Sequence, residues 1–194
     1  VAPPHCARCG GTLPPEGSCG FCADWPDALA AVWAAVWLDE GARQAMHRLK
    51  YDGWWQVSEA VAIGMQPVPL LRVPSVLVPI PLGRRRLRTR GYNQAERLAA
   101  ALARIGGHEV RTDLLVRRRE TGTQTKLTPE ARRVNVSGAF EAAGRVEGRV
   151  VLVDDVLTTG ATLAEAAMAL AGAGAARVDA VTFALARPPA TMLA

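Results

Sequence analysis

The segment Val150-Val151-Leu152-Val153-Asp154-Asp155-Val156-Leu157-Thr158-Thr159-Gly160-Ala161-Thr162 decides how the rest of this chain is interpreted. Its four leading apolar residues predict a buried strand of a parallel sheet, which is covered on both faces. Two carboxylates follow at the carboxyl end of that strand, where open α/β sheets bind their ligands. A short turn of small and hydroxyl residues then leads into a predicted helix.

The turn formed by residues 158–162 has the composition of a phosphate site. Backbone amides at a helix N-terminus point outward and attract a phosphate dianion. Gly160 allows the backbone to approach closely, and the threonines around it add hydroxyl donors. Asp154 and Asp155 would repel a phosphate, so we expect them to bind ribose hydroxyls or a divalent cation. The GxxxxGK[ST] pattern of a Walker loop is absent.

Strands and helices alternate in the remainder of the chain. Asn93 and Glu96 have the spacing of a capping box, and Gly106-Gly107 ends the helix that they begin. The repeated order of strand, helix and strand predicts a doubly wound, mainly parallel α/β sheet. The predicted strands are 76–80, 110–116, 150–153 and 178–185, and the predicted helices are 43–49, 93–105 and 163–170.

All four cysteines lie in the first 22 residues, as two CxxC pairs on a short linker. This spacing matches a structural Zn²⁺ site with four thiolate ligands, and a segment so short needs a metal to supply its folding energy. Two disulfides are one alternative, which fits less well because no secretory signal is expected. A redox CxxC is another, which fits less well because the motif occurs twice. The predicted ligands are Cys6, Cys9, Cys19 and Cys22, in a zinc-binding domain 1–24 that precedes a domain 25–194.

Residues 25–70 carry a mixed pattern. Trp33 and Trp37 stand four residues apart, as on one helix face, whereas the apolar residues from Val32 to Leu38 alternate as in a strand. All five tryptophans lie in the first 55 residues. Aromatic rings beside a basic surface can stack on bases, but we interpret these as core residues or as docking residues for the zinc module.

Composition excludes several classes of protein. Hydrophobic residues make up 49% of the 194 residues and charged residues 21%, which is not the composition of a disordered or collagen-like chain. The longest apolar stretch, residues 28–38, is too short to cross a bilayer. No charged segment followed by an apolar one is recognised near Val1. We therefore expect a soluble cytoplasmic protein without membrane insertion.

The net charge of +5 is distributed unevenly. Residues 84–133 carry 14 basic and 5 acidic side chains, a net +9, so that the remainder carries −4. Arginine supplies 21 of the 23 cations and suits bidentate contact with phosphate oxygens. The runs Arg84-Arg85-Arg86 and Arg117-Arg118-Arg119 fit a solvated surface as well as phosphate contact, and the phosphate could belong to pyrophosphate or to single-stranded DNA.

Residues 150–162 closely resemble the loop of type I phosphoribosyltransferases that binds 5-phosphoribosyl-1-pyrophosphate (PRPP). Other segments resemble the ComF family of competence-associated proteins, which have an N-terminal cysteine knuckle. Tyr92 and Gly83 depart from the family, which more often has Phe and His there. The resemblance covers nearly the whole chain, through the CxxC pairs, Leu49-Lys50-Tyr51, Pro79-Ile80-Pro81-Leu82, Arg90-Gly91-Tyr92-Asn93-Gln94, and Arg117, Thr121, Gln124, Leu127, Arg132, Asn135 and Phe140.

The resemblance implies a type I phosphoribosyltransferase fold that binds PRPP with Mg²⁺. It places a basic loop at residues 81–90, facing pyrophosphate, and a flexible hood at residues 117–135. The implied catalytic residues are Asp154, Asp155 and Arg90, the two aspartates holding the ribose diol. The 5-phosphate would be held by Thr158, Thr159, Gly160, Ala161 and Thr162, and the pyrophosphate loop and hood would use Arg84, Arg85, Arg86, Arg88, Arg90, Arg117, Gln124 and Arg132.

Two hypotheses for function follow. The first is an enzyme that transfers phosphoribose from PRPP to an unidentified acceptor, associated with DNA uptake in natural transformation. Thr158 stands where purine-salvage relatives have an acid, so classical purine salvage is not expected. The second is a non-catalytic adaptor that binds single-stranded DNA and works with other competence proteins, such as a helicase. A regulator that senses PRPP through the same loop is a third, weaker hypothesis.

Overall fold

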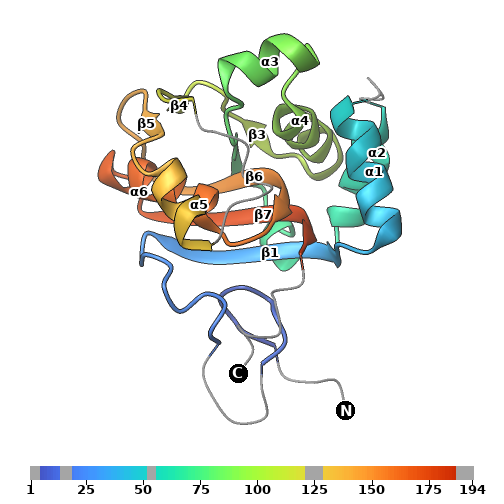
Figure 1. The fold of residues 1–194 in the computed structure, drawn as a ribbon, viewed down its shortest axis with the longest axis horizontal. Helices are drawn as coiled ribbons and strands as arrows, with labels where there is room; N and C mark the ends of the chain where they lie inside the picture. Colours follow the sequence, from blue (N-terminus) through green and yellow to red (C-terminus); the bar gives the residue numbers. More distant parts are fainter. Residues whose placement is uncertain (1–4, 14–18, 52–55, 121–128, 187–194) are drawn as a thin grey trace.

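Five parallel strands form the centre of the molecule. The computed structural model describes residues 5–13, 19–51, 56–120 and 129–186. Within these residues the sheet has the order β1-β7-β6-β2-β3, and every neighbouring pair is parallel (Figure 1). The strands are β1 (Leu29–Trp37), β2 (Val76–Pro79), β3 (Glu109–Val110), β6 (Arg149–Leu157) and β7 (Arg177–Leu185).

Helices cover both faces of this sheet. Along β6, Val151 and Val153 pack in one apolar cluster, whereas Val150 and Leu152 pack in another, because successive strand residues point to opposite faces. The first cluster contains α1 (Glu40–Tyr51), α2 (Val57–Met65) and α4 (Gln94–Gly106), and the second contains α6 (Ala161–Gly172). This arrangement confirms the predicted doubly wound, mainly parallel fold. Among the described helices, none has the length and apolarity needed to cross a bilayer.

The predicted strand 110–116 is wrong, because this segment divides between two sheets. β3 ends at Val110, and β4 (Leu115–Arg117) pairs antiparallel with β5 (Phe140–Ala142) in a separate two-stranded sheet. Between them Arg111 donates two hydrogen bonds to the Asp113 carboxylate, at 2.8 Å each. Asp113 lies on an exposed bend, and Leu115 beyond it packs in the core on the α6 side.

The mixed pattern of residues 25–70 resolves in favour of a strand and then helices. β1 lies at the edge of the sheet and pairs with β7, with Trp33 opposite Val181 and Trp37 opposite Leu185. The predicted helix 43–49 lies inside α1. A short 3-10 helix, η1 (Pro69–Leu71), leads from α2 toward β2.

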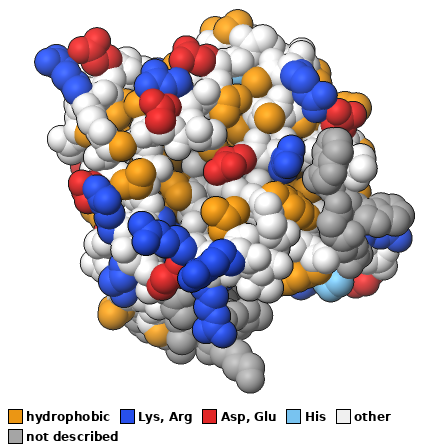
Figure 2. All heavy atoms as spheres, turned by 90° about the horizontal axis from the view of Figure 1, so that it is seen from above, with side chains coloured by type: hydrophobic (Ala, Val, Ile, Leu, Met, Phe, Trp, Pro, Cys, Tyr) orange, Lys and Arg blue, Asp and Glu red, His pale blue; other side chains and the backbone are white. Residues whose placement is uncertain are grey.

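The basic run after β2 was expected to be a loop, but residues 84–90 form the helix α3 (Arg84–Arg90). Arginine is a good helix former, and Gly91 ends the helix with a left-handed φ of 81° while its N–H donates to Leu87 O at 2.8 Å. The helix α5 (Pro129–Val136) lies in the segment that was expected to be the hood. α3 lies at the top of Figure 1, on the face that Figure 2 views directly, where Lys and Arg side chains gather at the lower left.

The strand order identifies a reversal point between β2 and β6, and we call the region at the carboxyl ends of these two strands the crevice. From β2 the chain moves outward to β3, whereas from β6 it moves the opposite way to β7, so the direction of winding reverses between β2 and β6. The register pairs Pro79 with Val153. The chain leaving β2 therefore lies beside Asp154 and Asp155 of β6. Ligands of open α/β sheets bind at such reversal points.

Candidate functional site

Asp154 and Asp155 occupy the end of β6, at the crevice. They are neighbours on a strand and therefore point to opposite faces of the sheet. Asp155 is only 6% exposed and lies on the side of α1 and α4, whereas Asp154 is half-buried and lies on the side of α6. The backbone N–H of Asp155 donates to Oδ1 of Asp154 at 2.8 Å. The two carboxylates thus line the crevice on both sides of one strand.

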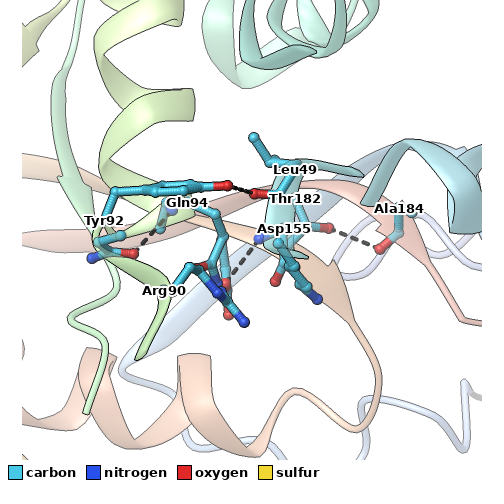
Figure 3. Close-up of polar contacts among 11 residues, drawn as sticks. Leu49, Arg90, Tyr92, Gln94, Asp155, Thr182 and Ala184 are labelled. Atoms are coloured by element: carbon cyan, nitrogen blue, oxygen red, sulfur yellow. Dashed lines mark hydrogen bonds and ion pairs between the residues drawn. The ribbon is translucent and has the colours of Figure 1, made fainter. Parts of the chain in front are cut away.

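Lys50 forms an ion pair with the buried Asp155 carboxylate. Lys50 stands in the last turn of α1, and the preceding Leu49 carbonyl accepts a hydrogen bond from the Tyr92 hydroxyl (Figure 3). The next residue, Tyr51, lies under the Arg90 guanidinium, 5.4 Å from ring centroid to Cζ. The end of α1 is therefore joined to β6 and to the segment between α3 and α4.

Asn93 fixes the segment that carries Arg90. Its side chain is buried, caps α4 by accepting from Ala95 N at 3.0 Å, and donates to Ile80 O at 3.0 Å just beyond β2. Arg90 donates to the Gln94 side chain, and both lie beside Asp155 in Figure 3. The predicted Asn93 cap is confirmed, and it holds Arg90 within reach of the acidic pair.

The two aspartates have opposite electrostatic environments. Burial, reinforced by the neighbouring Asp155 charge, raises the pKa of Asp154 well above its ordinary value. Burial also acts to raise the pKa of Asp155, but the charge and hydrogen bond of Lys50, together with Asp154 and Arg90, lower that pKa overall. Near Asp154, burial followed by the Arg86 charge lowers the pKa of Arg117, and Glu120 and Asp154 act against this shift. The site therefore combines one aspartate whose ionised form is favoured, Asp155, with one whose ionised form is disfavoured, Asp154.

Arg117 approaches the crevice from β4. Its guanidinium lies 5.1 Å from the Phe140 ring centroid and donates to Pro81 O at 3.4 Å. Glu120, further along, accepts a hydrogen bond from Arg85 N at 3.2 Å. The segments after β2 and after β4 are thereby joined, with Arg117 near Asp154 and Arg86 near Arg117.

The turn after β6 has the geometry that an anion site requires. Gly160 adopts a left-handed φ of 77° and is the N-cap of α6, where its carbonyl accepts from Ala164 N at 2.8 Å. Thr159 Oγ1 accepts from Ala161 N at 3.4 Å. The N–H groups of the first helical turn have no carbonyl partner within their own helix, so they suit an anion. The turn begins three residues after Asp155 and lies at the same end of the sheet.

The four cysteines form a cluster with the dimensions of a metal site. Their Sγ atoms all lie within 4.8 Å of one another, with 3.6 Å between Cys6 and Cys22 and 3.5 Å between Cys9 and Cys19. A tetrahedral site with metal–sulfur bonds of about 2.3 Å has sulfurs about 3.8 Å apart, whereas a disulfide is about 2.05 Å long. The cluster therefore fits one tetrahedral ion. Burial raises the pKa of the Cys22 thiol to about 12, and a bound cation would reverse that effect.

The cysteine segment is packed against the sheet. Its buried cysteines share one apolar cluster with Trp25, Val32 of β1 and Leu157 of β6. Arg8, inside the first CxxC, donates to the carbonyls of Cys22, Pro26 and Leu29 at 2.7–3.3 Å. These bonds join the two halves of the cysteine segment to the start of β1.

Asp154, Asp155, Arg90, Arg117 and the turn at residues 158–162 lie at this end of the sheet, together with two residues to which the sequence assigns no role. Lys50 reaches it through the ion pair with Asp155, and Trp25 through a hydrogen bond from Nε1 to the Thr159 carbonyl; both contacts join residues more than 100 positions apart, so no local pattern indicates them. Gln124 lies outside the described residues, as does the side chain of Arg132. On α3, Arg86 and Arg90 are half-buried, whereas Arg84, Arg85 and Arg88 are exposed.

Comparison with known proteins finds a match to the phosphoribosyl transferase domain family over residues 87–192. DNA utilization protein YhgH of Escherichia coli is 32% identical over 185 residues, which cover 90% of this chain and 81% of that protein. Competence protein F of Haemophilus influenzae is 29% identical over 174 residues, covering 84% and 76%. Among solved structures, orotate phosphoribosyltransferase from Aeropyrum pernix matches with a TM-score of 0.39 and 21% identity. The match covers 70% of this chain and 62% of the orotate phosphoribosyltransferase chain, which is less than two thirds of the length of that chain.

Proposed function

The chain belongs to the phosphoribosyl transferase domain family, among the ComF-like competence proteins, and on this premise we propose that it binds PRPP with Mg²⁺ and transfers phosphoribose to an acceptor. One observation carries the proposal. The acidic pair at the sheet crevice is followed directly by the Gly160 turn at the N-terminus of α6. That order matches a ligand with a diol and a phosphate on the same sugar. We place the reaction in the cytoplasm, in the handling of incoming DNA.

Each part of PRPP has a chemically matched partner. The turn at residues 158–162 would receive the 5-phosphate on its amides and threonine hydroxyls. Asp154 and Asp155 would accept hydrogen bonds from the ribose hydroxyls. Arg90 acts on Asp155 and Arg117 on Asp154, while Arg86 lies near Arg117, and these three arginines would face the pyrophosphate. Arg84, Arg85 and Arg88 are exposed, so they would contact the pyrophosphate only if α3 moved or unwound. Gln124 and Arg132 would contribute from the hood at residues 117–135.

The proposed chemistry is displacement at the anomeric carbon of ribose. The bond from C1 to the pyrophosphate oxygen breaks and its electron pair leaves with pyrophosphate, while the acceptor forms a new bond to C1 and releases its proton. Positive charge develops on the sugar, so the nearby Asp155 carboxylate, kept ionised by Lys50, would stabilise it. Mg²⁺, when bound, would neutralise charge on the departing pyrophosphate. Zn²⁺ would be held by Cys6, Cys9, Cys19 and Cys22 and would serve folding.

Calorimetry with PRPP tests the proposal. We expect saturable binding in the presence of Mg²⁺ and at least about tenfold weaker binding in Mg²⁺-free buffer, because two adjacent acids repel an unneutralised pyrophosphate. The Mg²⁺-free buffer is prepared without chelator, since a chelator would also remove metal from the cysteines. Titrations with ribose 5-phosphate and with pyrophosphate separate the two halves of the ligand. A wild-type protein that binds none of the three would rule out the proposal.

The exposed arginines favour a second candidate function, binding of single-stranded DNA. Arg84, Arg85 and Arg88 present three cations on one short helix without an acidic residue. We expect a labelled oligonucleotide to bind with an affinity that falls steeply with salt, and replacing all three with Gln to reduce the log–log salt slope by about 2. Fluorescence anisotropy measures both. The control replaces the exposed Arg43, Arg72 and Arg145 together, and an equal loss in the control would show that the binding is not localised at α3.

A further inference from the structure

Trp25 joins the cysteine segment to the turn of the proposed phosphate site. It follows Cys22 by three residues, and its backbone N–H donates to Cys22 O at 3.2 Å. Its indole is buried, with 6% of the residue exposed, and Nε1 donates to the Thr159 carbonyl at 3.0 Å. This hydrogen bond spans 134 residues of sequence. It ends on the backbone of the proposed phosphate turn, so the indole can affect how that turn is held.

The fit between Trp25 and Gly160 is tight. A Cβ atom at Gly160 would lie 2.5 Å from Cε2 of the indole, closer than any two such atoms can approach. Gly160 also has a φ of 77°, which L side chains rarely adopt. Two independent requirements therefore place glycine at this position. The first exists only because the indole lies directly against the turn.

Both halves of the cysteine segment hold the indole in place. Phe21, inside the second CxxC, packs edge-on against Trp25 with 5.6 Å between ring centroids and an interplanar angle of 67°. Arg8, inside the first CxxC, donates to the carbonyls of Trp25 and Pro26 at 3.1 and 2.7 Å. The position of the indole is therefore set by contacts from each CxxC pair.

The hydrogen bond to Thr159 determines the direction of the next amide. In a trans peptide the C=O and the following N–H point in opposite directions. Since the Thr159 carbonyl points to Trp25, the Gly160 N–H points away from the indole. We propose that Trp25 is a positioning residue, whose indole N–H holds the Thr159–Gly160 peptide so that the Gly160 N–H is offered to the 5-phosphate. This inference rests on the proposed function and adds a remote residue to its phosphate site.

A filling role in the core is the competing explanation, and Trp25→Phe separates the two. Phenylalanine keeps an aromatic ring in contact with Phe21 but removes the N–H donor. With ribose 5-phosphate as the probe, we expect the Kd of the variant to rise roughly threefold to tenfold, the effect of one hydrogen bond. Trp33→Phe is the matched control, because Trp33 is a half-buried tryptophan on β1 and should leave the Kd unchanged.

An amide NMR readout distinguishes positioning from loss of packing. In ¹⁵N-labelled protein we expect Trp25→Phe to reduce the shift of the Gly160 cross-peak on adding ribose 5-phosphate, measured relative to the ligand-free variant so that the lost ring current of the indole cancels. A variant with wild-type Kd and a wild-type Gly160 response would overturn the inference while leaving the proposed function intact. A wild-type protein that binds neither ribose 5-phosphate nor PRPP would overturn both. A lower Tm with an unchanged Gly160 response would assign Trp25 to packing alone and would also overturn it.

Discussion

Asp154→Asn is expected to raise the melting temperature of the ligand-free protein and, at the same time, to remove most of its affinity for PRPP with Mg²⁺. Burial and the adjacent Asp155 charge raise the pKa of Asp154, so the folded protein disfavours its ionised form. An amide of nearly the same shape eliminates that unfavourable charge. A gain of about 1 kcal/mol would raise Tm by roughly 2–4 °C in a chain of this size.

The sign of the pH dependence follows from the direction of the shift. A pKa raised by folding costs stability once the pH exceeds the unfolded value of about 4, and the full cost is reached above the folded value. The Tm advantage of Asp154→Asn should therefore be largest at neutral or alkaline pH and should shrink as the pH approaches about 4. Thermal unfolding of both proteins across this range measures it.

Asp155→Asn is the informative counterpart. The Lys50 ammonium lowers the pKa of Asp155 despite burial, so the ionised form contributes stability, which is lost as the pH falls through the lowered pKa. Replacing Asp155 leaves Lys50 without its partner carboxylate and should lower Tm at neutral pH. Two neighbouring aspartates thus have opposite expected effects on stability and the same expected effect on ligand binding.

The loss of PRPP affinity in these variants should be roughly 10- to 100-fold, since each removes a charged acceptor of ligand hydrogen bonds. Calorimetry measures it, with Asp113→Asn as the control. Asp113 is exposed, and its pKa is lowered to about 2 mainly by the hydrogen bond from Arg111, away from the crevice. Undiminished PRPP affinity in both Asp154→Asn and Asp155→Asn would contradict the assignment of the acidic pair.

Local patterns in the sequence predicted those parts of the fold whose causes are themselves local. The apolar run of β6, its two acids and the Gly160 turn lie within one segment, and each step uses a strong short-range preference. The Asn93 cap was predictable for the same reason, because its partner amide is two residues away. The cluster of four cysteines was predictable because ligand spacing constrains the backbone near a metal.

Long-range contacts explain what the sequence pattern missed. Lys50 meets Asp155, and Trp25 meets Thr159, only because the strand order places β1 beside β7 and β7 beside β6, so that segments adjoining β1 reach the end of β6. The family resemblance implies a basic loop at residues 81–90, whereas residues 84–90 form the helix α3. This helix forms because arginine has a high helix propensity and because Gly91 caps its C-terminus. The charge of the segment indicates neither property.

Removing metal from the four cysteines is expected to produce the largest loss of stability. Four sulfurs lie within 4.8 Å of one another, and a structural metal bound by such a cluster supplies folding free energy directly. We expect a zinc chelator to lower Tm by roughly 10 °C or more, corresponding to at least about 3 kcal/mol. Elemental analysis should find about one zinc per chain before treatment, and adding Zn²⁺ back should restore Tm. Cys9→Ser should reproduce the loss without chelator.

The same treatment tests how the cysteine segment communicates with the phosphate turn. If Phe21 and Arg8 position the Trp25 indole, metal removal should weaken ribose 5-phosphate binding through the same hydrogen bond to Thr159 that Trp25→Phe removes. The two perturbations act on one contact, so their effects on Kd should be non-additive. In Trp25→Phe, metal removal should change Kd much less than in wild type, whereas Tm should fall in both. Fully additive losses in Kd would mean that the metal affects the turn by another route.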